Sequence, residues 1–416
     1  MIVPWRRAVR PAHFLDDALS AVTAADWTAD EPPVAWLYWP VDLANPYQSL
    51  IYSRFARRNL VPIRVTTFGA VDRLLAALPP GMPAVLHVHW LYEVTAGSRS
   101  GSEAVARVER FEARLRALSE RGVRLVWTVH NVLPHETVHR EVELRLRRFM
   151  LGAAELVHVM HGGHLDLLRT AFDGQPRASL VIPHPTFAGA YPDWVDRATA
   201  RSALGIPLGA RVLVTFGQIR PYKGHGAFLE AFDLAARADP RLRWLVAGKV
   251  RDETGGDEFV ARAARHPAVL LHPGFVPEAD VQLYLRAADA ALYPYRSSLN
   301  SGAVALTAGF DLPAYASTGT SLADLMPPEA VVRFDLSDPR RTADTLAAPP
   351  VIESGAARAV VRAHARAFAP AAVSERMAAA VREHLAGRIS VTVPAVTAAR
   401  VIPGRSGGGR PGRTGG

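Results

Sequence analysis

The chain has 416 residues, of which 49% are hydrophobic and 21% are charged; this is a globular composition, and the length suits two domains. It has no cysteine, which excludes disulfide bonds, thiolate metal sites and cysteine nucleophiles, and which is compatible with the cytoplasm. No apolar run reaches the ~18 residues of a membrane span, and no secretory signal is expected at the basic N-terminus. We therefore expect a cytoplasmic protein.

The net charge is +9, with a pI near 10.2. A basic protein attracts nucleic acid, anionic lipid or phosphorylated ligands, although a solvated basic surface is an equally simple explanation. No nucleic-acid-binding module is recognised, so no nucleic-acid partner is expected. Of the 48 cationic residues only Lys223 and Lys249 are lysines, which suggests that these two positions need a compact ammonium group.

Strand-like apolar runs alternate with amphipathic helical stretches along the whole chain, a pattern that predicts parallel α/β sheets. In the first half a helix is expected from Asn45-Pro46 to Arg58, because Asn caps helices and Pro suits their first turn. Further helices are expected over 102–121 and 135–150. The predicted strands of this half are 34–40, 62–68, 84–90, 124–130, 155–160 and 179–184.

The second half repeats the pattern. Its predicted strands are 211–217, 243–249, 269–275, 290–295, 313–317 and 330–334. Its predicted helices are 224–238, 255–265, 278–288, 301–310 and 356–386. We expect an N-terminal domain over 1–188, a Pro- and Gly-rich linker over 189–209, a C-terminal domain over 210–386 whose last helix packs back on the first domain, and a disordered tail over 387–416. Ligands of such sheets bind where the strands end.

The segment 214–232, VTFGQIRPYKGHGAFLEAF, places cations beside a predicted helix start. A strand ends at Gly217, a loop with Arg220 and Lys223 follows, and Gly224 opens a helix. Free backbone N–H groups and the helix dipole add to the side-chain charges and form an anion site, which suits a diphosphate. A surface loop with two solvated cations is the alternative.

This segment resembles the G-R-L-x-x-x-K-G loop of the GT-B glycosyltransferases, broadly the group 1 or family-4 enzymes, whose Arg and Lys hold the phosphates of a nucleotide-sugar donor. Lys223 and Gly224 fall on the family's Lys and Gly. Gln218 stands at the family's Arg position, and Arg220, two residues later, is our candidate for the missing cation. The resemblance implies a GT-B fold, in which two Rossmann-like domains face each other across a cleft.

The resemblance continues downstream in the same order. The segment 243–249 is similar to the family's strand-then-glycine segment and implies that Lys249 lies at the cleft, where we expect it to bind the donor diphosphate. The segment 272–296 is similar to the G-F-V…A-A-D…P stretch and implies that the backbone of Gly274, Phe275 and Val276 binds the nucleobase. The side chains of Phe275 and Leu283 are expected in the core.

The residues Asn300, Ser301 and Gly302 form a helix start, with capping side chains and then a residue that permits close approach. A second helix N-terminus is therefore expected at the donor diphosphate. The family usually carries a Glu-x7-Glu motif here that contacts the donor sugar and ribose, but Ser298 and Leu306 occupy those two positions. This departure leaves the sugar, the ribose contact and the stereochemical course open.

On the acceptor side, His130 and Asn131 follow a predicted strand in a T-V-H segment similar to one in the family. A neutral His130 imidazole could accept the proton of the acceptor hydroxyl or bind the donor sugar, and it is our candidate catalytic residue. His87 and His89 share one strand face and are expected in the core or lining the cleft. The segment 40–48 replaces the family's Gly-rich loop, which indicates unusual acceptor recognition.

His135, Glu136 and His139 match the H-E-x-x-H signature of zinc hydrolases. The motif directly follows Pro134, so it is predicted in the first turn of a helix, and no third ligand signature follows. We therefore expect no metal, with His135 and Glu136 at the rim of the acceptor side. Zinc hydrolysis stays a remote alternative.

The sequence thus predicts a metal-independent glycosyltransferase that needs no cofactor beyond its nucleotide-diphosphate sugar co-substrate. The acceptor is expected to be a hydroxyl of a carbohydrate, lipid-linked or small molecule. Arginine-rich helices over 102–121 and 135–150 could contact an anionic membrane peripherally, or form a solvated face. The missing glutamates motivate another reading, a non-catalytic nucleotide-sugar-binding or partner protein of the same fold.

Overall fold

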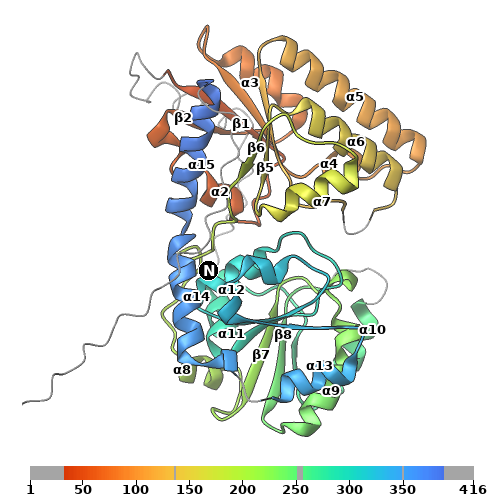
Figure 1. The fold of residues 1–416 in the computed structure, drawn as a ribbon, viewed down its shortest axis with the longest axis vertical. Coiled ribbons are helices and arrows are strands. Elements are labelled where there is room, and N and C mark those ends of the chain that lie inside the picture. The colour runs from red at the N-terminus through yellow and green to blue at the C-terminus, as the bar shows by residue number, and fades with distance from the viewer. Residues whose placement is uncertain (1–31, 135–136, 251–255, 349–350, 388–416) are drawn as a thin grey trace, which may run out of the picture.

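The computed structural model describes residues 32–134, 137–250, 256–348 and 351–387, coloured in Figure 1. It contains two six-stranded sheets, each flanked by helices, one above the other in Figure 1. Within the described residues no helix is both long and apolar enough to cross a membrane. The tail expected over 387–416 lies, from residue 388 on, outside the described residues.

The first sheet is parallel throughout and has the strand order β2-β1-β3-β4-β5-β6. Its strands are β1 (Val34–Trp39), β2 (Leu60–Arg64), β3 (Ala84–Val88), β4 (Arg124–Thr128), β5 (Leu156–Val159) and β6 (Ser179–Val181). Its helices are α2 (Tyr47–Ile51), α3 (Val71–Ala77), α4 (Tyr92–Thr95), α5 (Gly101–Glu120), α6 (Arg140–Ala153) and α7 (Gly163–Phe172).

The second sheet is also parallel, with the order β12-β11-β10-β7-β8-β9. Its strands are β7 (Arg211–Phe216), β8 (Leu242–Ala247), β9 (Val269–His272), β10 (Ala290–Tyr293), β11 (Ala314–Ser317) and β12 (Val331–Phe334). The helices of this half are α8 (Arg197–Ala203), α9 (His225–Ala238), α10 (Gly256–Ala263), α11 (Val281–Ala287), α12 (Gly302–Gly309), α13 (Pro339–Ala347), α14 (Gly355–Ala367) and α15 (Pro370–Leu385).

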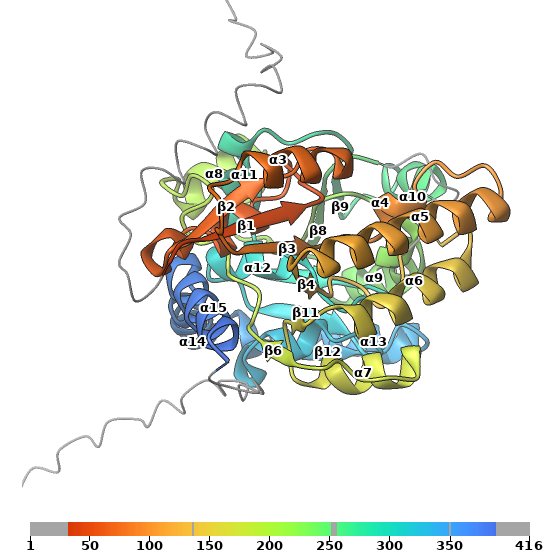
Figure 2. The same cartoon turned by 90° about the horizontal axis from the view of Figure 1, so that it is seen from above.

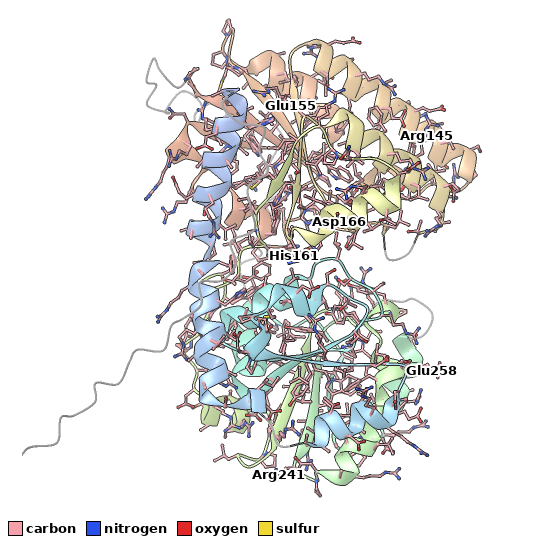
Figure 3. All side chains as sticks on the ribbon, viewed as in Figure 1. Arg145, Glu155, His161, Asp166, Arg241 and Glu258 are labelled. Carbon is pink, nitrogen blue, oxygen red and sulfur yellow. The ribbon has the colours of Figure 1, made fainter. Side chains whose placement is uncertain are left out.

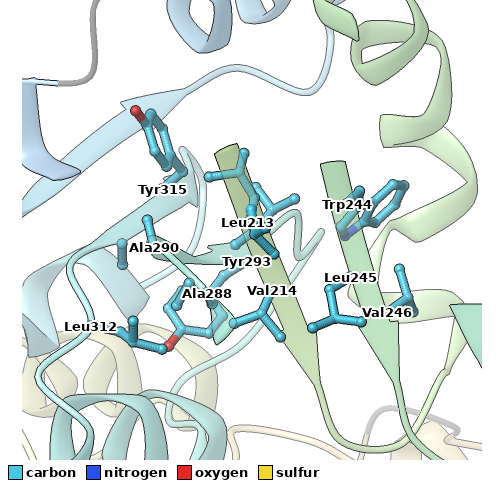
Figure 4. Packing of buried hydrophobic residues seen from close by; sticks show 14 of the residues in the cluster. Leu213, Val214, Trp244, Leu245, Val246, Ala288, Ala290, Tyr293, Leu312 and Tyr315 are labelled. Carbon is cyan, nitrogen blue, oxygen red and sulfur yellow. The ribbon is translucent and has the colours of Figure 1, made fainter. Parts of the chain in front are cut away.

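The strands are continuous apolar runs because helices cover both faces of each sheet. In the second domain Val214, Trp244, Leu245 and Tyr293 meet in one cluster, shown in Figure 4. The indole N–H of the buried Trp244 donates to the hydroxyl of Thr215 at 3.0 Å, so its polar atom is satisfied inside the core. The alternation of strand and helix thus produces one large core cluster in the second domain and two in the first, one on each face of its sheet.

The last helix, α15, packs against the first domain, and with α14 it runs along one side of both domains (Figures 1 and 2). Val373 and Met377 lie in the same apolar cluster as Trp36 and Phe55. The hydroxyl of Ser374 accepts a hydrogen bond from the backbone N–H of Arg54 at 2.9 Å. The chain therefore crosses between the domains twice, once on the way out and once on the way back.

Several expected helix boundaries differ from the structure. The helix expected over 356–386 is two helices, because Pro370 restricts the residue before it to extended backbone and starts a new helix. The helix expected from Asn45 to Arg58 is α2 followed by a separate 3-10 turn over Phe55–Arg58. The linker contains α8, whose first turn is capped by the carboxylate of Asp196.

Candidate functional site

The loop after β7 approaches the loop after β8 so closely that both need glycine. Gly217 and Gly248 have φ angles of 105° and 146°, and a Cβ on Gly248 would lie 2.1 Å from the carbonyl oxygen of Gly217. The backbone N–H of Ile219 donates to the carbonyl of Lys249 at 2.9 Å. The end of β7 therefore presents bare backbone without side chains to obstruct a ligand.

Gly224 fixes the start of α9 against the end of β10. Its φ is 69°, and a Cβ there would lie 1.9 Å from the carbonyl oxygen of Pro294. No L-residue with a side chain fits that contact. The N-terminus of α9 is thereby held next to the strand that leads to α12, so the two helix starts predicted from the sequence lie on neighbouring strands, β7 and β10.

Lys223 is buried between these elements, with only 7% of its surface exposed. Its Nζ lies 5.4 Å from the centre of the Tyr295 ring and 3.4 Å from the position of a Cβ on Gly217. Burial, followed by the charge of Arg220, lowers the pKa of Lys223 from 10.5 to about 7. No salt bridge to Lys223 is found within the described residues, so an anion beside it would restore its charge.

Arg220 and Gln218 lie side by side on the same loop. The Arg220 Nε donates to the Gln218 Oε1 at 2.9 Å. Burial raises the pKa of Tyr92, on α4 of the first domain, to about 12, and the charge of Arg220 opposes that rise. Arg220 is therefore close enough to the first domain to act on it electrostatically across the boundary.

The start of α12 touches the first domain directly. The Ser301 hydroxyl caps the helix by accepting from the backbone N–H of Ala303 at 3.2 Å, and Gly302 is the first helical residue. The Asn300 amide nitrogen donates to the carbonyl of His130 at 3.2 Å and lies 3.5 Å from that of Val129. The helix start predicted here is present, and Asn300 joins it to the end of β4.

The predicted nucleobase loop and Lys249 lie at the ends of β9 and β8. The backbone N–H of Gly274 donates to the carbonyl of His272 at 3.0 Å, which turns the chain just beyond β9. The Phe275 side chain is 80% exposed, so the expectation that it lies in the core is wrong. Strand β9 ends at His272, and Phe275 therefore stands outside the sheet. Lys249 is exposed, and Val276 is half-buried.

His130 lies at the carboxyl end of the first sheet. Its ring stacks on Trp90 with centroids 4.4 Å apart and 23° between planes, and Tyr47 packs edge-on at 5.0 Å. Burial, with the nearby rings of His89 and His184, lowers the pKa of His130 well below 6.5. Asn131 and His130 line a small cavity of about 20 Å³. The His130 imidazole is therefore neutral, while its backbone carbonyl accepts the hydrogen bond from Asn300 before α12.

Among the described residues, the other histidines predicted at the acceptor side lie in the interior of the first domain or near the start of α6. His87 and His89 are buried in the first domain, as expected. His135 and Glu136 lie outside the described residues. The helix predicted to begin at 135 is α6, which begins at Arg140, so His139 of the zinc motif lies just before the helix and not in its first turn. In the described ranges no group of three His, Asp or Glu residues could hold a metal ion.

A cavity that the sequence did not reveal lies between the domains beside α12. It measures about 640 Å³ and is lined mostly by apolar side chains, including Val304, Ala305 and Ala308 on one face of α12. His161, which Figure 3 shows at the domain boundary, lines it from the first domain. The one sequence signal was the helical spacing of these small and apolar residues, which equally fits a core position.

Known proteins match less than half of the chain in sequence and most of it in fold. The model of the family described as "Glycosyl transferases group 1" matches residues 196–308. A D-inositol 3-phosphate glycosyltransferase of Corynebacterium efficiens is 32% identical over 186 residues, which is 42% of this chain and 43% of the relative. One of Segniliparus rotundus is 29% identical over 45% of this chain and 44% of the relative. The match thus spans less than half of each relative.

Solved structures match over a much longer stretch. Sucrose-phosphate synthase from Thermosynechococcus elongatus aligns with a TM-score of 0.61 and 16% identity, over 85% of this chain and 99% of that one. HepE of Anabaena, solved with UDP, aligns with a TM-score of 0.59 and 15% identity, over 84% of this chain and 99% of that one. The chain thus has the GT-B fold, and its residues 196–308 match the family model of the group 1 glycosyl transferases.

Proposed function

We propose that the protein transfers a sugar from a nucleoside-diphosphate sugar to a hydroxyl group, with the donor bound mainly by the second domain. The observation that carries this proposal is Lys223, a buried amine just before the start of α9 and over the ring of Tyr295, which follows β10 on the way to α12. The N-termini of these helices carry partial positive charge. A diphosphate at this position would restore the lysine charge and meet both helix ends.

The same groups suit the departure of the nucleoside diphosphate. As the bond from sugar to phosphate breaks, negative charge grows on the diphosphate, and fixed positive groups stabilise it there. We assign this role to Lys223, Arg220 and the α12 start at Ser301 and Gly302, in place of a metal ion. The solved complexes of HepE with UDP and with UDP-glucose support a uridine nucleotide as the first donor to test.

The reacting hydroxyl would bind on the side of the first domain, beside His130 and Asn131. This hydroxyl belongs to a carbohydrate, a lipid-linked or a small-molecule acceptor, and the nucleotide sugar is the sole co-substrate. Contact with anionic membrane would suit a lipid-linked acceptor and would make the protein peripheral to the inner membrane face. The lack of cysteine supports a cytoplasmic location.

One observation favours a second candidate, a protein of this fold that binds nucleotide sugars without turnover. Leu306 is only 5% exposed and lies in the core of the second domain. The Ser298 hydroxyl donates to the carbonyl of Asn300 at 2.7 Å. Neither position offers a carboxylate to a sugar, so any carboxylate contact to the donor must come from elsewhere.

A ligand panel with two matched variants tests the proposal. Thermal unfolding is measured with UDP, GDP and dTDP and with their sugars, for the wild type, Lys223→Met and Lys249→Met. The sequence predicts a diphosphate role for both lysines, but Lys249 is exposed whereas Lys223 is buried. We therefore expect one nucleotide series to raise Tm in the wild type and in Lys249→Met and to leave the Tm of Lys223→Met unchanged. If no nucleotide shifts the wild type, the donor site is refuted. A shift without hydrolysis or transfer on any acceptor favours the non-catalytic candidate.

A further inference from the structure

A continuous chain of hydrogen bonds runs through the buried interior of the first domain and ends at His130. It contains four histidines and one threonine, which lie in strands β3 to β5 or just after them, together with one tyrosine and one backbone carbonyl. We call it the hydrogen-bond chain, and its members in order are Ile182 (carbonyl), His158, Thr128, His87, Tyr52, His89 and His130.

The first link determines the direction of the protons. His158 Nε2 lies 2.8 Å from the carbonyl oxygen of Ile182, and a carbonyl only accepts, so Nε2 carries the proton. In a neutral ring Nδ1 is then bare and accepts from the Thr128 hydroxyl at 2.9 Å. That hydroxyl has one proton, so it must accept from His87 Nε2–H at 2.7 Å.

The same reasoning carries the direction to the domain boundary. With Nε2 protonated, the Nδ1 of His87 is bare and accepts from the Tyr52 hydroxyl at 2.7 Å. Tyr52 has no second proton, so it accepts from His89 Nε2–H at 2.5 Å. His89 Nδ1 is then bare, and His130 Nε2–H must donate to it at 3.0 Å. Nδ1 of His130 is left without a proton.

The chain needs every ring to be neutral, and burial provides this. His87, His89 and His158 are at most 1% exposed. Burial lowers the pKa of His158 to about 4 and the pKa values of His87 and His89 well below 6.5. In this direction the Nδ1 of His158, His87 and His89 each accepts from a donor, so a second proton on any of these three rings would set two donors against each other.

We propose that the hydrogen-bond chain fixes the tautomer of His130, with its proton on Nε2, so that Nδ1 serves only as an acceptor for a hydroxyl group. The nature of that hydroxyl, on a sugar substrate, rests on the proposed function; the tautomer does not. His130 in this state cannot donate a proton to the departing diphosphate, and its lone pair repels anionic oxygens. Tyr52 and Thr128 are positioning residues that act through His130.

The tautomer is measurable without any substrate. Long-range 1H–15N NMR spectra of protein labelled at histidine nitrogens separate the Nε2–H form, the Nδ1–H form and the cation. In the wild type at neutral pH we expect the single Nε2–H form for His130, and also for His87, His89 and His158. A wild-type His130 with its proton on Nδ1, or one that is cationic, overturns the proposal.

Two variants then break the chain at different links. Tyr52→Phe removes the acceptor of His89, and Thr128→Val removes the hydroxyl between His158 and His87 with little change of shape. In both variants the hydrogen bonds between the break and His130 can run in either direction. We therefore expect His130 to lose its single Nε2–H signal and to become a mixture of tautomers. Resonance assignment uses His130→Asn, whose spectrum lacks that ring.

Tyr47→Phe is the matched control. Tyr47 is also fully buried and touches His130 and His89, but its hydroxyl makes none of the hydrogen bonds of the hydrogen-bond chain. We expect this variant to keep the single Nε2–H form. If Tyr52→Phe and Thr128→Val keep it as well while staying folded, the hydrogen-bond chain does not set the tautomer. If both variants unfold, the wild-type spectrum alone tests whether the His130 proton is on Nε2. A wild-type His130 in the Nε2–H form together with no transferase activity would refute the proposed function and leave the tautomer proposal standing.

Discussion

Lys223 is expected to take up a proton when a diphosphate binds. In the free protein burial and Arg220 lower its pKa from 10.5 to about 7. A nearby diphosphate favours the ammonium form and raises that pKa again. Above pH 7 the free protein therefore carries mostly neutral amine while the complex carries ammonium, so affinity falls as pH rises.

The size of the effect follows from the pKa of the free protein. With a pKa of about 7, about one tenth of Lys223 is charged at pH 8, and binding there takes up about 0.9 proton. The dissociation constant is then expected to increase about 50-fold between pH 7 and pH 9. The lowering from 10.5 corresponds to about 5 kcal/mol at about 1.4 kcal/mol per pKa unit.

Folding stability changes in the opposite direction to affinity. Because the folded-state pKa lies below the unfolded one, the unfolded chain binds more protons between pH 7 and 10.5. The free energy of unfolding therefore gains from Lys223 as pH rises through that window, by an amount of order 5 kcal/mol at most. Lys223→Met should be more stable than the wild type near pH 7 and should lose this advantage toward pH 10.

Isothermal titration calorimetry measures the proton uptake directly. The nucleotide sugar that gives the largest thermal shift is titrated at several pH values, and at pH 8 in buffers of different ionisation enthalpy. A nucleotide sugar is preferred over a nucleoside diphosphate because it has no terminal phosphate group that titrates near pH 6. Lys249→Met should behave as the wild type. Affinity that stays flat from pH 6 to pH 9, with no proton uptake, would refute the argument.

Two further predictions concern the loops at the domain boundary. Gly224→Ala places a Cβ 1.9 Å from the carbonyl oxygen of Pro294 at a φ of 69° and should lower the free energy of unfolding by more than about 2 kcal/mol. The control is Gly226→Ala, in the first turn of α9 with open space around it, which should be neutral or stabilise the protein by up to about 1 kcal/mol. Denaturant titration compares the two variants, and equal effects would contradict the close contact at Gly224. Asn300→Ala removes the hydrogen bond to the His130 carbonyl and should cost about 0.5–1.5 kcal/mol. Small-angle scattering should then show a less compact molecule, and an unchanged radius of gyration would argue against Asn300 as a contact that holds the domains together.

The strands were the most predictable part of the molecule. All twelve predicted strands are present within about two residues at their starts, because a strand buried on both faces is a short apolar run that few other elements produce. The loop positions that depend on glycine are also predictable, since Gly217 directly follows β7 and Gly224 directly precedes α9. The GT-B fold inferred from the resemblance is confirmed by the solved structures.

The errors arose where tertiary contacts override local pattern. Short helices such as α4 and α8 carry too few residues for a clear period, although Asp196 is a capping residue that marks the start of α8 in the sequence. Phe275 looked like a core residue by composition alone, and only the end of β9 at His272 shows why it is outside. The hydrogen-bond chain joins residues up to 130 positions apart in sequence order (Tyr52 to Ile182), and no local pattern reveals such a set.

The return of α15 to the first domain has a consequence for synthesis on the ribosome. The apolar face formed by Trp36, Phe55 and Val85 is completed by Val373 and Met377. These two residues emerge only after the entire second domain has been translated. The first domain must therefore wait with an uncovered surface while its successor folds, a period in which chaperones or aggregation compete for it.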